Sequence, residues 1–194
     1  MAVDYTARTY GDRLEINVLG SNDVQDWVRN LQTWRALAHE ARANRVDRAE
    51  ALQVIREQRA NLDAFSHIII EGHSRGGAVA QQIAFEIANR ALAHGRKRPR
   101  IYLFLYGSKR TGDRAFVTFL TTFAGVFAYR NRGDFIPLLP PWYASVSTTV
   151  EGRWRPVWVA HQDYGYARYL RTVKDSRASR PSERSTAEAE RSDG

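Results

Sequence analysis

The chain has 194 residues, 43% of them hydrophobic, a formal net charge of +8 and no cysteine. This length predicts one domain with a full hydrophobic core, and the lack of cysteine excludes disulfides, thiolate metal ligands and a cysteine nucleophile. No apolar run reaches the roughly 18 residues that a membrane span requires, and no histidine pair has the spacing of a His-Glu-x-x-His zinc site. We therefore expect no metal, no cofactor and no transmembrane segment.

The amino terminus and the charge bear on location and partners. The first residues, Met1–Arg8, lack the apolar core of a secretory signal, so the sequence predicts a cytoplasmic location by default, with export by another route left open. A net positive charge favours anionic surfaces such as phospholipid or nucleic acid. Residues 174–194 contain five basic and five acidic residues, so the excess belongs to the rest of the chain. The excess positive charge is densest at Arg90–Arg100. Two roles stay open for this segment: a solvated connection or an anion-facing patch.

The amino-terminal third predicts a strand followed by helices. Loose alternation over 13–19 is typical of a strand, and Gly20-Ser21-Asn22-Asp23 has the composition of a loop that starts a helix. Apolar residues then recur at helical spacing over 24–34 and again over 46–62. The second of these helices leads towards an isoleucine-rich run that begins at His67.

That run enters the stretch around which the chain is organised, Gly72-His73-Ser74-Arg75-Gly76. Apolar residues at helical spacing follow it, so the order is strand, tight turn, helix. Gly-x-Ser-x-Gly in this setting is the form of a nucleophile elbow, in which a strained turn exposes the serine hydroxyl at the end of a strand. Gly72 and Gly76 leave room for strand and helix to approach each other closely. Ser74 is therefore the candidate nucleophile.

The rest of the chain continues the alternation of strands and helices. In chain order we expect a buried central strand at 100–106, a helix at 113–122, a strand at 125–130, strands at 145–150 and 154–160, and a last helix at 163–173. This order predicts an α/β fold with a mostly parallel sheet and helices on both faces. Residues 174–194 have almost nothing to bury and predict a disordered polar tail, so the domain is expected to span 1–173.

A serine nucleophile needs a base and an acid. The base takes the hydroxyl proton, and the acid orients the base and stabilises its charged form. In folds with a serine elbow the chain order is serine, acid, histidine. His161, after the apolar run 157–160, is the candidate base, and Asp134, after the strand at 125–130, is the candidate acid. Two structural roles stay open: Asp134 bonding its own backbone in a turn, and His161 as a buried or surface histidine.

Three other acids lie between Ser74 and His161. Glu86 belongs to the elbow helix and is expected to face away from the site, and Glu151 with Gly152 has the composition of a hairpin turn. Asp113 precedes a predicted helix. We therefore favour Asp134 over each of them.

From Leu14 to Leu170 these residues resemble the class-three (fungal-type) triacylglycerol lipases, which have the α/β-hydrolase fold. Gly72–Ala78 is similar to the family's Gly-His-Ser-Leu-Gly-Gly-Ala, and Tyr106–Asp113 to its Phe-Gly-x-Pro-Arg-Val-Gly-Asn/Asp. Asp134–Pro140 resembles its Asp-x-Val/Ile-Pro-x-Leu-Pro, whose aspartate is the triad acid. His161, before Tyr164, is similar to its late histidine. Four segments in the right order are more specific than one motif.

The same resemblance implies the oxyanion hole. Leu19-Gly20-Ser21 followed by Asp26–Leu31 is similar to the family's Arg-Gly-Thr/Ser and Asp-Trp-Leu-x-Asn-Leu. By this match Ser21 supplies one donor and the backbone N–H of Arg75 the other. Both are needed, because the tetrahedral oxyanion must meet donors that are already in place.

The sequence departs from the family pattern at three positions. Leu19, Arg75 and Lys109 stand where the family has arginine, leucine and proline. Arg75 and Lys109 are expected to add positive charge near the site and to favour an anionic surface over neutral fat. The stretch from 34 to 63 is compact, so we expect no large lid and no strong activation by an oil interface.

The leading hypothesis is a serine esterase or lipase that hydrolyses lipid esters through an acyl-enzyme, with phospholipase activity also open. One alternative is a non-catalytic member of the fold that binds a lipid or a partner. A nucleic-acid-binding protein is the other, but the basic residues are scattered and no recognised motif is present.

Overall fold

The computed structural model describes residues 4–19, 41–58, 62, 64–95, 97–151 and 154–162. Several predictions lie outside these ranges: the helix at 24–34, the oxyanion residue Ser21, the last helix at 163–173 and the tail at 174–194.

The described residues form a six-stranded sheet in the order of the chain. Its strands are β1 (Tyr5–Tyr10), β2 (Arg13–Val18), β3 (His67–His73), β4 (Arg100–Tyr106), β5 (Ala124–Asn131) and β6 (Thr148–Glu151). β1 pairs antiparallel with β2, and all later pairs are parallel. Val18 is in register with Gly72, Gly72 with Leu105, and Leu105 with Ala128. The carboxyl ends of β2 to β5 therefore share one edge, here called the carboxyl edge.

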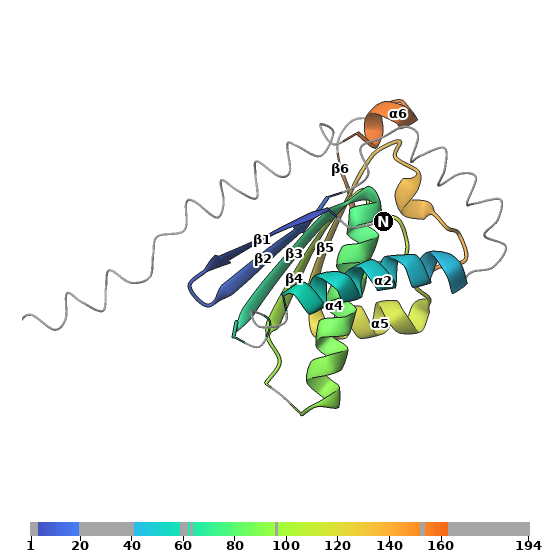
Figure 1. Ribbon diagram of the computed structural model, residues 1–194. Helices are drawn as coiled ribbons and strands as arrows, with labels where there is room; N and C mark the ends of the chain where they lie inside the picture. The colour runs from blue at the N-terminus through green and yellow to red at the C-terminus, as the bar shows by residue number, and fades with distance from the viewer. Residues whose placement is uncertain are drawn as a thin grey trace, which may run out of the picture.

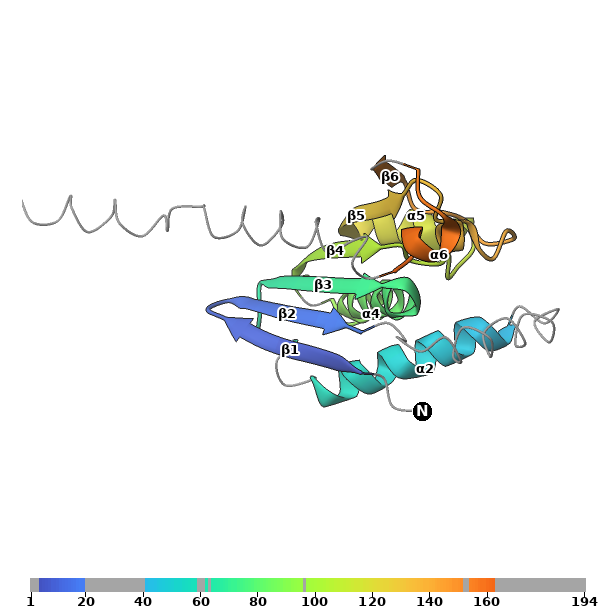
Figure 2. The ribbon, with the colours of Figure 1, turned by 90° about the horizontal axis from the view of Figure 1, so that it is seen from above.

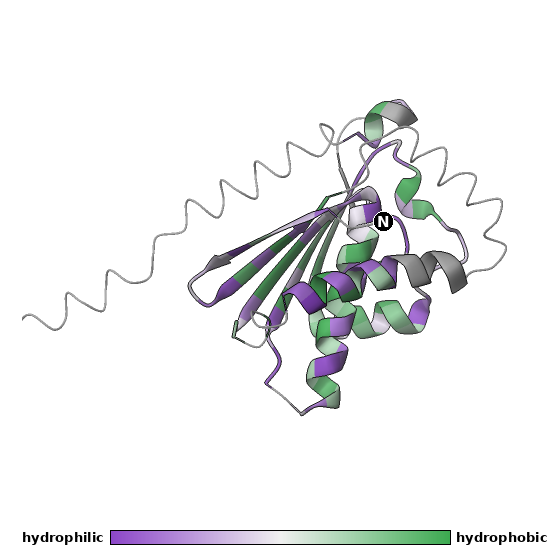
Figure 3. Ribbon diagram, viewed as in Figure 1, coloured by the Kyte–Doolittle hydropathy of each residue, from purple (hydrophilic) through white to green (hydrophobic). Residues whose placement is uncertain are grey.

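Three helices cover one face of this sheet (Figures 1 and 2): α2 (Ala41–Glu57), α4 (Ser74–Ala93) and α5 (Arg114–Phe123). α4 packs against both α2 and α5 and so lies between them, and α4 and α5 also pack on the strands. The core lies between sheet and helices, and Figure 3 shows hydrophobic residues along both. Its fully buried members include Leu14, Ile16, Ile68, Ile70, Val79, Ile83, Leu103 and Leu105. The predicted α/β fold with a mostly parallel sheet is thus confirmed, but among the described residues the long helices cover one face of the sheet, whereas helices on both faces were predicted.

The opposite face of the sheet carries aromatic side chains. Phe104 and Phe127 stack with their ring centroids 5.0 Å apart, and Tyr106 and Tyr129 do so at 5.6 Å. Within the described ranges no long helix covers this face (Figure 2). None of the described helices has the length and hydropathy of a membrane span.

Most predicted elements are found, with shifted ends. α2 begins five residues before the predicted helix at 46–62, and β6 begins at Thr148 within the predicted strand at 145–150. β1 was not predicted, because its residues are mostly exposed and show little apolar alternation.

The predicted strand at 154–160 is wrong. Residues 154–156 have no regular structure, and Val157–Ala160 form the short helix α6. The backbone N–H groups of Val159 and Ala160 both donate to the carbonyl of Pro156, each at 2.9 Å. Proline has no N–H to give to a sheet but suits the start of a helix. The hairpin predicted at Glu151 is wrong as well, because the next described element after β6 is the helix α6 and not a strand.

Candidate active site

The elbow motif forms the junction between β3 and α4 at the carboxyl edge. Ser74, the first residue of α4, has a φ of 54°, the only positive value among the described residues other than glycine. Such a backbone costs energy and persists only where the surroundings enforce it. A Cβ on Gly72 would lie 2.5 Å from the carbonyl oxygen of Gly76, and one on Gly76 would lie 2.5 Å from that of Val18. Both glycines are therefore needed to let β2, β3 and α4 meet around Ser74.

The structure brings Ser74, His161 and Asp134 together in one line of contacts. His161 Nε2 lies 2.7 Å from Ser74 Oγ. On the other side of the ring, His161 Nδ1 lies 3.0 Å from Asp134 Oδ2 and 3.2 Å from its Oδ1. Asp134 and His161 are both buried. With Asp134 ionised, Nδ1 carries the proton, and Nε2 is left to accept one from the serine.

Asp134 also fills the structural role that the sequence left open. Its Oδ1 accepts the backbone N–H of Ile136 at 3.0 Å, which shapes the turn after β5. The two roles are compatible, because a carboxylate has several lone pairs. The turn bond holds the carboxylate in the orientation that meets the ring of His161.

His161 follows α6 rather than a strand, so its placement has a different cause from the predicted one. Asn131, the last residue of β5, donates from its buried Nδ2 to the carbonyl of Ala160 at 2.8 Å. This bond fastens the end of α6 to the strand that leads to Asp134. The role of Asn131 was missed, because nothing local in the sequence links it to residue 160.

His73, the residue before the candidate nucleophile, was also missed. Its Nε2 lies 3.0 Å from the backbone carbonyl oxygen of His161, and the two rings lie 5.0 Å apart with a 30° tilt. A carbonyl oxygen only accepts, so Nε2 of His73 carries the proton and donates. The elbow motif placed His73 next to Ser74 but gave no sign of this contact, since its partner is distant along the chain.

The start of α4 can stabilise negative charge. Arg75 is its second residue, so its backbone N–H has no acceptor one turn earlier in the helix. The helix macrodipole also favours negative charge at this end. The predicted oxyanion role of the Arg75 amide is compatible with this position. Ser21 lies outside the described residues.

Three ion pairs join α2 to the body. Arg75 pairs with Glu50, Lys109 Nζ lies 3.0 Å from Asp47 Oδ2, and Arg48 Nε lies 2.7 Å from Glu86 Oε1. All three carboxylates are buried. The expectation that Arg75 and Lys109 present positive charge to the substrate is therefore corrected: each cation is paired with a buried carboxylate of α2.

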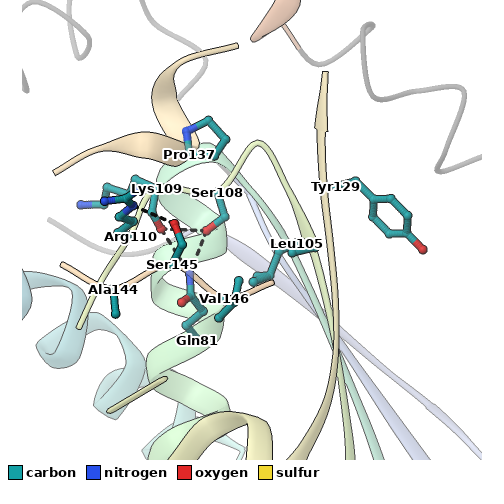
Figure 4. Close-up of a pocket in the computed structure, with 11 residues that line it drawn as sticks. Gln81, Leu105, Ser108, Lys109, Arg110, Tyr129, Pro137, Ala144, Ser145 and Val146 are labelled. Carbon is teal, nitrogen blue, oxygen red and sulfur yellow. Dashed lines mark hydrogen bonds between the residues drawn. The ribbon is translucent and has the colours of Figure 1, made fainter. Parts of the chain in front are cut away.

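A small cavity lies beneath the loop that follows β4 (Figure 4). Gln81, Ser108, Lys109 and Val146 contribute to its lining, and Gln81 Nε2 donates to Ser108 Oγ at 2.9 Å and to the carbonyl of Lys109 at 3.2 Å. Its volume of about 10 Å³ corresponds to one water molecule. This cavity is too small for an acyl chain. Among the described residues, no group of three or more metal-binding side chains is placed to hold an ion.

Comparison with known proteins places the chain among lipases. Residues 16–144 match the family model described as Lipase (class 3). This range contains the elbow and Asp134 and ends before His161.

Several solved structures of fungal lipases match part of the chain. Mono- and diacylglycerol lipase from Aspergillus oryzae is 18% identical, with a TM-score of 0.47 over 78% of this chain and 60% of that one. Rhizomucor miehei triacylglyceride lipase is 18% identical, with a TM-score of 0.46 over 76% and 61%. Lipase II from Rhizopus niveus is 17% identical, with a TM-score of 0.44 over 67% and 52%. The chain thus spans about half to three fifths of the length of these lipases.

Proposed function

Since the chain belongs to the class 3 lipase family, we propose that it hydrolyses carboxylic esters of lipids through an acyl-enzyme on Ser74. The observation that carries this proposal is the alignment of Ser74 Oγ, the His161 ring and the Asp134 carboxylate, with contacts of 2.7 and 3.0 Å. Nucleophile and base within hydrogen-bond reach, with the base oriented by a third group, is the arrangement that activates a serine.

In the proposed reaction His161 Nε2 takes the hydroxyl proton as Ser74 Oγ attacks the ester carbonyl carbon. The electron pair of the carbonyl bond moves to its oxygen, which the Arg75 amide meets at the start of α4. When the tetrahedral intermediate collapses, the C–O bond to the alcohol breaks and His161 returns the proton to the leaving oxygen. Water then attacks the acyl-enzyme by the same route, releasing the acid and restoring Ser74.

Asp134 has an electrostatic task in both halves of the reaction. The imidazolium that forms on His161 lies against its buried carboxylate, where charge interactions are stronger than in water. The proton stays on the histidine, because the carboxylate stabilises the cation rather than accepting its proton.

Ser21 is proposed as the second oxyanion donor, on the family resemblance alone. Ser21→Ala removes the hydroxyl and leaves the Arg75 amide, so kcat/KM should fall by at most about 10²- to 10³-fold. An unchanged kcat/KM would remove Ser21 from the proposed mechanism.

The proposal is tested by labelling with a fluorophosphonate, which reacts with activated serines, and by hydrolysis of p-nitrophenyl esters of increasing chain length. Wild type should be labelled and should hydrolyse the esters. Folded Ser74→Ala and His161→Ala proteins should do neither. A folded wild-type protein that takes no label and cleaves no ester would favour a non-catalytic, lipid-binding role. The chain-length series identifies the acyl group that the site prefers.

As the partner of the site we propose an anionic lipid surface, in keeping with the net charge of +8. Arg75 and Lys109 do not support this, because their charges are paired. The basic cluster at 97–100 leads into β4 and lies at the amino ends of the parallel strands, opposite Ser74 (Figure 1). Support comes instead from residues at the carboxyl edge. Faster hydrolysis in phosphatidylglycerol-containing vesicles than in neutral ones tests the preference.

A further inference from the structure

Large apolar side chains are exposed at the carboxyl edge. Trp154 is 69% exposed and Trp142 47%. Leu19, directly after β2, and Leu138, after β5, are also exposed. At the opposite edge, Tyr10 and Leu92 are exposed to 46% and 41%. Tryptophan is costly to expose to water but well suited to a membrane interface, where its ring lies at the level of the headgroups.

The segment that carries Trp154 is fastened to the candidate triad. The backbone N–H of Arg155 donates to the carbonyl of Arg132 at 3.2 Å. The carbonyl oxygen of Arg155 lies so close to Gly133 that no side chain would fit there, and Gly133 has a φ of 96°. Residues 154–155 therefore lie on the turn that leads directly into Asp134.

The loop that carries Trp142 is held by a different anchor. Arg110 Nη1 donates to the carbonyls of Pro141 and Tyr143, at 3.2 and 3.1 Å. Arg110 itself follows β4 at the carboxyl edge. Trp142 follows β5 and Trp154 follows β6, so both lie beyond the carboxyl ends of parallel strands. Figure 1 shows α6 and the loop after β5 at this end of the sheet.

Positive charge accompanies the tryptophans. Arg132 and Arg155 are exposed, and the ion pairs among the described residues include neither of them. Arg110 adds a third cation, bonded to neutral oxygens only. The acids Asp4, Asp113 and Glu151 lie at the same edge. Arg114, the first residue of α5, and Arg130, near the end of β5, bring the arginines there to five, so they outnumber these acids. Arginines near a membrane surface are attracted by anionic headgroups.

We propose that Trp142, Trp154, Arg132 and Arg155 form the surface, here called the lipid-facing rim, with which the protein lies on an anionic bilayer. The inference rests on the proposed function, because it turns the carboxyl edge, where Ser74 lies, towards esters in that bilayer. The tryptophans insert at the headgroup level, and the arginines meet phosphate oxygens.

Binding is measured by co-sedimentation in a Ser74→Ala background, so turnover does not alter the vesicles. The vesicles are phosphatidylcholine alone or with phosphatidylglycerol. The Trp142→Ala/Trp154→Ala and Arg132→Gln/Arg155→Gln pairs should each weaken binding to the anionic vesicles by about tenfold or more. The matched pairs from the opposite edge, Tyr10→Ala/Leu92→Ala and Lys97→Gln/Arg100→Gln, should bind like the parent.

Two further readouts sharpen the test. The preference for anionic vesicles should shrink as salt rises to physiological strength, where charges are screened beyond roughly 8 to 10 Å. Tryptophan emission of the parent should shift to shorter wavelength on vesicle binding, and the Trp142→Ala/Trp154→Ala pair should lose most of this shift.

Equal binding to the two kinds of vesicle at low salt would overturn the proposal. So would an equal loss of binding from the opposite-edge pairs, or a marked drop in Tm in the double-tryptophan variant, which would show that these rings pack on the body. Failure of the proposed function is read separately, as a lack of ester hydrolysis by wild type.

Discussion

Nε2 of His73 donates a hydrogen bond to the backbone carbonyl of His161 at 3.0 Å, so the residue before the proposed nucleophile holds the proposed base. The bond crosses from the elbow to the loop after α6, and the adjacent rings restrict each other further. His73 is thus a positioning residue for the proposed base, because its side chain holds the backbone of His161.

His73→Leu should lower kcat by about 10- to 100-fold with little change in KM, because small misplacements of catalytic groups are costly. His73→Gln should keep most of the activity, since its amide nitrogen can donate from nearly the same place as Nε2. Ester hydrolysis by both variants, with their Tm values, makes the comparison. If leucine is tolerated as well as glutamine, the bond has no part in positioning His161.

Ser74→Ala and His161→Ala should each abolish measurable ester hydrolysis, and the double variant should be no slower than the worse single. Members of a triad act as a unit, so removing the second residue should lower the rate little further once the first is gone. Circular dichroism establishes that each variant is folded. A double variant far slower than both singles would mean that His161 acts independently of Ser74.

Asp134→Asn should lower kcat by about 10⁴-fold, because an amide favours the wrong imidazole tautomer. The matched control is Asp113→Asn. Asp113 is the N-cap of α5, where its Oδ1 accepts the Phe116 N–H at 2.8 Å. Asparagine caps helices about as well as aspartate, so this variant should resemble wild type in both kcat and Tm. The reverse ranking would transfer the acid role to Asp113.

Arg75→Leu should lower the free energy of unfolding by about 3 kcal/mol, because it leaves the buried Glu50 carboxylate without its cation. Within the described residues Glu50 Oε2 has no hydrogen-bond partner, so Arg75 is its main compensation. Adding Glu50→Leu should restore most of the loss, since an apolar pair can replace a buried ion pair. Urea unfolding of wild type, Arg75→Leu and Arg75→Leu/Glu50→Leu gives the three free energies of unfolding to compare.

The control for that series is Arg48→Leu, which breaks the other ion pair between α2 and α4. The Arg48 side chain is 57% exposed against 25% for Arg75, so solvent already screens its interaction with Glu86. Arg48→Leu should therefore lower the free energy of unfolding by less than Arg75→Leu does. A larger loss from Arg48→Leu than from Arg75→Leu would contradict this account.

The elbow could be predicted from the sequence, because its causes are local. The isoleucine run, the Gly-x-Ser-x-Gly turn and the helical spacing behind it lie within one continuous stretch. The candidate partners Asp134 and His161 were found through chain order and family resemblance, and the structure brings both to Ser74. The apolar run 157–160 was assigned wrongly, since a short run of valine, tryptophan and alanine suits a strand or a buried helix equally.

What only the tertiary structure decided is which polar groups meet. Glu50 is 25 residues from Arg75, Asp47 is 62 from Lys109, and His73 is 88 from the carbonyl of His161. The sequence alone does not distinguish an arginine or lysine that faces solvent from one that pairs with a buried carboxylate. Whether Arg75 and Lys109 attract an anionic surface therefore depended on where α2 packs, and burial against α4 placed their counter-charges beside them.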